Sequence, residues 1–173
     1  MQIDDTHSHQ LRRAVIHDDS EKIKNLLQIA PQRKSWSSDV NGSALHLAAW
    51  WDKTKAAQTL LDTTPELTRS QNRRGDTPLH VAAFVGPSAE NMLRLLLERD
   101  PKAAFIRNSM GHTFLDEARD VGAAMQIFNE TAPRTASIYR KLRGTPTAEI
   151  DPVDSWSKRP SVSATQSQLY VGR

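Results

Sequence analysis

The chain has no cysteine, few aromatic residues and no long apolar run. Without cysteine it can form no disulfide, no cysteine-based zinc site and no thiol nucleophile. Hydrophobic residues make up 38% of the chain and aromatic residues 6%, which is low for a protein built around one large core. No apolar stretch reaches the roughly 20 residues of a transmembrane helix, and the first 20 residues are too polar for a secretory signal. We therefore expect an intracellular protein, in the cytoplasm or also in the nucleus, that makes no membrane contact.

Charge is unevenly distributed along the 173 residues. The formal net charge is +3, but residues 1–132 hold 16 Lys/Arg and 17 Asp/Glu, whereas residues 133–173 hold 7 and 3. The first part is therefore close to neutral and the second is basic. Because a nucleic-acid groove needs clustered positive charge, nucleic acid is not an expected partner of the first part.

The most informative stretch covers residues 75–86, Gly-Asp-Thr-Pro-Leu-His-Val-Ala-Ala-Phe-Val-Gly. Proline suits the first turn of a helix, and Leu79, Ala82 and Ala83 share one face at spacings of three and four residues. The small alanines let a neighbouring helix approach closely. The same pattern occurs 34 residues earlier and 36 residues later, and a weaker copy lies a further 34 residues before the earlier one. The matching residues are Leu45, His46, Ala48 and Ala49, then Leu11 and Ala14, and finally Leu115, Ala118 and Gly122.

This period predicts a stack of helix pairs. We expect units at about 8–40, 41–74, 75–110 and 111–131, with residues 1–7 disordered and residues 132–173 mostly disordered. The expected helices are 8–17, 21–30, 43–51, 54–62, 77–85, 88–98, 113–121 and 123–130. The last unit keeps fewer of the stacking residues, as expected where a stack ends in water.

Residues 75–86 closely resemble the core signature of ankyrin repeats, and Asn41–Ala49 resembles it with Ser-Ala in place of Thr-Pro. Residues 111–118 are a more degenerate copy. The resemblance spans about residues 8–131 and implies an all-α solenoid with a concave face formed by turn tips and inner helices. It also implies that this face binds a protein partner and that the chain is not an enzyme.

Apolar residues at the ends of the inner helices are the first candidates for partner contacts. Exposed apolar stripes mark interaction sites, and tryptophan is enriched among binding hot spots. The alternative is that one residue of the Trp50–Trp51 pair packs into the core between units. The candidates at these positions are Ile16, Trp50, Trp51, Phe84 and Val85.

The turn tips supply the second group of candidates. Two adjacent arginines beside the tryptophan pair would form a cationic rim around an aromatic centre, suited to a partner with apolar and acidic side chains. Ordinary solvated loop charges are an equally good interpretation. The candidates are Arg73, Arg74, Asp76, Met110 and His112.

No set of residues predicts catalysis, a metal or a cofactor. In the ankyrin pattern, the histidines at positions 46 and 80 order the turn region, and no nucleophile or carboxylate pair lies at a matching spacing. His7 and His9 form an isolated pair without supporting ligands, which favours a solvated segment over a metal site. No glycine-rich phosphate loop is present.

The C-terminal part allows further hypotheses. Residues 135–143 can form a helix with Ile138 and Leu142 four residues apart, either as a cap on the stack or as a docking motif. Trp156 and Tyr170 are candidate motif anchors, and Ser161 follows a basic stretch that a kinase could recognise.

Two functional hypotheses result. The first is a non-catalytic adaptor that binds a protein on its concave face. The second is a regulatory protein that acts through its basic tail on nucleic acid or an acidic surface, with the repeats as a scaffold. Weak self-association through the tryptophan pair is a further expectation.

Overall fold

In a computed structural model of the chain, residues 3–29 and 42–143 are described, and every element among them is helical. The α-helices are α1 (Ile3–Ile16), α2 (Ser20–Ile29), α3 (Ala44–Trp50), α4 (Thr54–Thr63), α5 (Pro78–Val85), α6 (Glu90–Arg99), α7 (Phe114–Glu117), α8 (Val121–Thr131) and α9 (Pro133–Arg143). Short 3₁₀ helices are η3 (Pro65–Arg69), η4 (Gly86–Ala89) and η5 (Pro101–Phe105). The predicted all-α solenoid is confirmed for these ranges.

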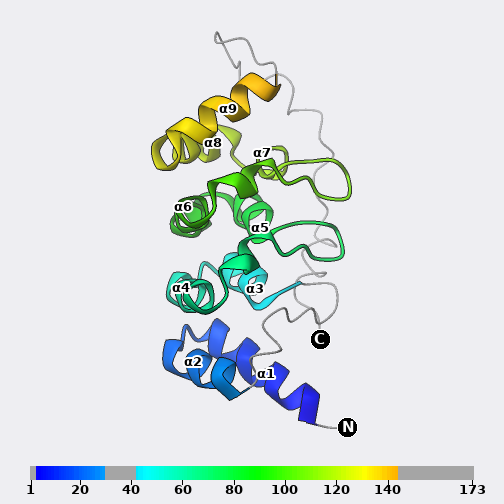
Figure 1. Cartoon of the computed structure of the whole chain (residues 1–173), viewed down its shortest axis with the longest axis vertical. Helices are drawn as coiled ribbons and strands as arrows, with labels where there is room; N and C mark the ends of the chain where they lie inside the picture. The colour runs from blue at the N-terminus through cyan, green and yellow to red at the C-terminus, as the bar shows by residue number, and fades with distance from the viewer. Residues whose placement is uncertain (1–2, 30–41, 144–173) are drawn as a thin grey trace.

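The helices stack as pairs in two layers (Figure 1). Helices α1, α3, α5 and α7 form the inner layer, and α2, α4, α6 and α8 form the outer layer. The loops before α5 and α7 project beyond the inner layer on one side of the stack. The expected tail beyond residue 143 and the connector at 30–41 lie outside the described residues.

The inner helices pack through the repeated leucine and alanine positions. Leu45, Ala48 and Ala49 are fully buried in α3, and their equivalents in α5 expose no more than 2% of their surface. The outer helices contribute large residues to the same core, with Leu60 and Leu61 buried in α4. Small residues inside and leucines outside thus give each pair a face that only a neighbouring pair can cover.

Each later inner helix begins in the same way. The residue before the helix has extended backbone, and its N–H donates to the side chain three residues on, which satisfies one of the free amides of the first turn. The bond joins Ser43 to His46 Nδ1 at 3.0 Å, Thr77 to His80 Nδ1 at 3.2 Å, and Thr113 to Asp116 Oδ2 at 2.8 Å.

The bounds of α1, α6 and α7 differ from the prediction, and α8 begins at Val121, two residues before its predicted start. Helix α1 begins at Ile3, before the predicted start at residue 8, so residues 3–7 are helical. A 3₁₀ turn, η4, replaces the predicted first turn of α6. Helix α7 ends at Glu117 instead of continuing to 121, because the Arg119 N–H donates to the Ala83 carbonyl of α5 and the Asp120 carboxylate caps α8.

Helix α9 belongs to the ordered stack, which therefore extends past the predicted boundary near residue 131. It packs on α8 and η5 through Ala136 and Tyr139, whereas Ile138 and Leu142 are exposed. The Tyr139 ring contacts the aromatic rings of η5, α7 and α8, with centroid distances from 5.6 to 6.3 Å. The capping interpretation of this segment is thus the one that its contacts favour.

Candidate protein-binding surface

The projecting loops before α5 and α7 are held by one asparagine each. Asn72 Oδ1 accepts the N–H groups of Arg74 at 2.8 Å and Asp76 at 3.0 Å. Asn108 Oδ1 likewise accepts the N–H groups of Met110 and His112, both at 3.0 Å. These asparagines were missed as site-forming residues, although their 36-residue spacing in the sequence signals the role.

One buried histidine joins each of these loops to the preceding unit. In His46, Nδ1 accepts the Ser43 N–H, so Nε2 carries the proton and donates to the Asp76 carbonyl at 2.8 Å. His80 Nε2 donates in the same way to the His112 carbonyl at 3.0 Å. Burial lowers the pKa of His46 to about 4 and also lowers the pKa of His80. Both side chains are therefore neutral at pH 7, as a structural role requires.

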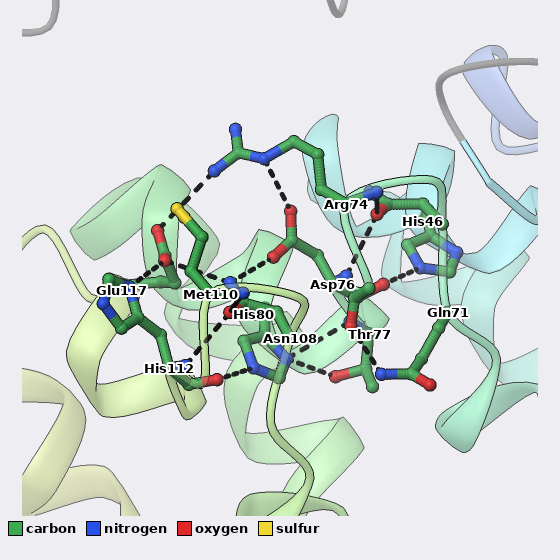
Figure 2. A network of polar contacts seen from close by, with 12 residues as sticks. His46, Gln71, Arg74, Asp76, Thr77, His80, Asn108, Met110, His112 and Glu117 are labelled. Atoms are coloured by element: carbon green, nitrogen blue, oxygen red, sulfur yellow. Dashed lines mark hydrogen bonds and ion pairs between the residues drawn. The ribbon is translucent and has the colours of Figure 1, made fainter.

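A polar network runs along the loops toward α7 (Figure 2). Arg74 lies 3.3 Å from Asp76 Oδ2 and 4.0 Å from Glu117 Oε2. Asn108 Nδ2 donates to Asp76 at 2.8 Å and to Glu117 at 3.1 Å, and the His112 ring contacts Glu117 at 2.7 Å. The Arg74 charge is thus balanced within the protein, so it forms no simple cationic rim.

Trp50 and Phe84 are brought together by the stacking of α3 on α5. Their rings lie 6.1 Å apart at 19°, and both side chains are half-buried. Phe84 also lines a shallow pocket with Val81, His80, Arg74, Asp76 and Glu117. This pocket connects the aromatic pair to the polar network and forms the centre of the candidate surface.

The other predicted residues differ in accessibility. Trp51 is 47% exposed directly after α3, whereas Val85 is half-buried against the core. Met110 is 57% exposed. Asp76 is only 4% exposed, so it can position Arg74 but offers little surface to a partner.

The remaining two predicted residues are both exposed. Ile16 is 38% exposed at the end of α1, in the position of its unit that Trp50 and Phe84 occupy in theirs. Arg73 is exposed at the tip of the loop before α5. Glu117 and Val81 join the centre, but sequence reasoning missed both.

Two further findings concern metal ions and membranes in the described part of the chain. Among those residues, no group of three or more His, Cys, Asp or Glu side chains is placed to hold a metal ion. Within the same ranges, the longest helices are too short and polar to cross a membrane. The His7–His9 pair falls partly outside the described side chains, and His9 is exposed.

Comparison with known families agrees with the fold. A family model for ankyrin repeats, in three copies, matches residues 11–109, which is more than half of the chain. A search of curated protein sequences gave no match. The helix pairs, the histidine bridges between units and the family match lead to one conclusion: the chain belongs to the ankyrin-repeat family.

Proposed function

We propose that the chain is a non-catalytic adaptor whose protein partner binds across the inner helices and loops centred on Trp50 and Phe84. Ankyrin repeats are generally protein–protein interaction modules and are typically not enzymes. The observation that carries the proposal is the stacked aromatic pair, which spans two units and lies beside an exposed tryptophan. Aromatic side chains that are already held in place lose little conformational entropy on binding, which suits them as anchors.

The polar side of the surface defines the partner more closely. Because Arg74 is already paired with Asp76 and Glu117, the strongest attraction comes from apolar contact, not from charge. Met110 and His112 extend the surface, and Arg73 lies at its rim. A partner segment with one or two large apolar side chains and neutral polar neighbours fits best.

The test is affinity capture from native cell extract followed by binding measurements with the purified partner. Trp51→Ala removes an exposed ring and leaves the core intact, so it is the primary variant. We expect it to weaken binding at least tenfold, as truncation of a hot-spot residue does. The double variant Trp50→Ala with Phe84→Ala should abolish detectable binding, with circular dichroism to show that the helices persist.

Controls separate this proposal from the tail hypothesis. Lys102→Ala changes an exposed residue of η5 and should bind like the wild type. Replacement of Lys158 and Arg159 by glutamine in the full-length chain lowers the charge of the tail only. If binding is lost in that variant and falls steeply with salt, while Trp51→Ala has no effect, the tail carries the function and the proposal is wrong.

A further inference from the structure

Helix α9 presents an apolar pair on the side that faces away from the stack. Leu142 is 74% exposed and Ile138 is 54% exposed, whereas Ala136 and Tyr139 on the other side are 0% and 3% exposed. Arg134, Ile138 and Leu142 lie four residues apart and therefore share one helical face. Figure 1 shows α9 at the end of the stack, with α8 beneath it and no described helix above it.

This face is not what an end cap needs. The last helix of a solenoid must cover the core on one side and keep a polar surface on the other. Leu142 is instead the most exposed of the large hydrophobic side chains in the described ranges. The inward face of α9 supplies the capping contacts through Ala136 and Tyr139, whereas Ile138 and Leu142 stay largely exposed.

The charge of α9 is also one-sided. The helix carries Arg134, Arg140, Lys141 and Arg143 and no acidic residue. Three of these lie in the last turn, where a positive charge stabilises the helix dipole, and Arg143 also binds Asp116 of α7 at 2.7 Å. Arg134 lies in the first turn, where a positive charge is unfavourable for the helix, and it is exposed. Its position has no explanation within the helix itself.

We propose that the outer face of α9, formed by Arg134, Ile138, Lys141 and Leu142, docks an acidic amphipathic segment of a partner protein. The segment would place one or two leucine, isoleucine or phenylalanine side chains on the apolar pair. Its Asp or Glu residues would meet Arg134 and Lys141 at either end. This surface lies on a different element from the Trp50–Phe84 centre, and the proposal does not depend on that site.

Charge and area favour this occupant over two others. A second copy of the chain would bring two helices without acidic residues against each other, and like charges at close range repel. An anionic membrane would attract the basic residues, but a helix that lies in a membrane surface needs a broad apolar face. Here Ala136 and Tyr139 are committed to the stack, which leaves only the apolar pair for insertion.

The test is a selection of random displayed peptides on the immobilised full-length chain. Recovered peptides are synthesised with a fluorescent label and titrated by anisotropy against the full-length protein and its variants. We expect them to combine Asp or Glu with Leu, Ile or Phe. Leu142→Gln should weaken their binding about tenfold, in line with the loss of one buried leucine contact. Arg134→Gln should weaken binding at low salt and have less effect at high salt.

Matched controls make the result specific to α9. Ile29→Gln removes an apolar side chain that is 69% exposed on α2, and it should leave the affinity unchanged. Trp51→Ala should also leave it unchanged, which separates this surface from the one proposed above. Both Leu142 and Arg134 are exposed, so their substitution leaves the core intact, and thermal unfolding checks this.

Four outcomes would overturn the proposal. The first is peptides without acidic residues, or an affinity that Leu142→Gln does not change. The second is flotation with phosphatidylcholine vesicles that contain phosphatidylserine, abolished by Leu142→Gln, which would assign the face to a membrane. The third is a dimer in sedimentation that Leu142→Gln dissociates. The fourth is peptide binding only after Glu149, Asp151 and Asp154 are changed to asparagine, which would make the chain's own acidic residues the occupant.

Discussion

The buried His46 side chain makes a specific prediction for stability against pH. It is 1% exposed, accepts the Ser43 N–H on Nδ1 and donates from Nε2 to the Asp76 carbonyl. A second proton would have to enter at Nδ1, where an N–H already points, inside a buried site. Burial accordingly lowers the pKa of His46 from 6.5 to about 4.

The sign of the effect follows from proton binding in the two states. Between pH 6.5 and about 4 the unfolded chain binds a proton at His46 and the folded chain does not. The free energy of unfolding therefore falls as the pH drops below 6.5 and levels off near pH 4. At about 1.4 kcal/mol for each pH unit, the loss from this one group is about 3 kcal/mol. The pKa of His80 is lowered in the same direction, so its contribution adds to the loss.

Urea unfolding across this pH range, compared between the wild type and His46→Gln, measures the contribution of His46. Glutamine can still donate to the Asp76 carbonyl but does not titrate, so the variant should lose less stability in acid than the wild type. At neutral pH the variant should be the less stable of the two proteins. Titration of the imidazole signals by NMR gives the pKa directly. Parallel pH profiles for the two proteins, or a His46 pKa near 6.5, would refute the reasoning.

Three further predictions concern the joints of the stack. Gly75 and Gly111 both have positive φ, but an added Cβ at Gly75 would lie 2.6 Å from a backbone nitrogen of the next loop, whereas one at Gly111 would meet no atom within 4 Å. In urea unfolding, Gly111→Ala should therefore lower the unfolding free energy by about 1 kcal/mol, and Gly75→Ala should lower it by about 1–3 kcal/mol more. Asp18 has a φ of 57°, and its carboxylate accepts a hydrogen bond from a backbone N–H of α4 at 2.7 Å. Asp18→Ala should lower the unfolding free energy by about 1–3 kcal/mol and Asp18→Asn by less, and equal losses in the two variants would contradict the assigned role. Asp116→His removes the acceptor for Arg143 of α9 and should lower stability by about 1–3 kcal/mol, with faster amide hydrogen exchange in α9; unchanged exchange would show that the ion pair does not hold the helix.

The repeated helix pairs could be predicted from sequence because their spacing is local. Leucine and alanine at fixed intervals indicate which face of each helix is buried, and the burial of Leu45, Ala48 and Ala49 agrees with this. The helix ends were harder to predict. Helix α7 is short because an amide of the following residues bonds to α5, and that contact depends on the stacking of two units.

The candidate surface was predictable only in part for the same reason. Trp50 and Phe84 occupy equivalent positions 34 residues apart, so their approach follows from the repeat. Arg74 and Glu117 lie 43 residues apart and share no repeat position, so their pairing could not be read from the pattern. A charge that looks available in the sequence is therefore held by a neighbouring unit in the structure.

The last inner helix shows how the stack ends. In α3 and α5 the third helical residue is a histidine, whose Nε2–H needs a carbonyl from the loop of the next unit. No further loop of this kind follows α7 in the described ranges, and the equivalent residue is Asp116. A carboxylate caps the helix equally well and also accepts from Arg143 of α9 at 2.7 Å, while the Tyr139 hydroxyl contacts Thr113.

Helix α9 thus makes both the polar and the apolar contacts that a following helix pair would make with the last pair of the stack. The Tyr139 ring covers the aromatic residues of the last pair, and its hydroxyl and Arg143 reach the start of α7. These contacts fix the rotation of α9 about its own axis, because turning the helix would break all of them together. The same constraint holds Ile138 and Leu142 on the opposite side of the helix, where they are 54% and 74% exposed. The inner face of α9 caps the stack, and its outer face is apolar and basic. Binding of a partner segment to that outer face is the best explanation for both features.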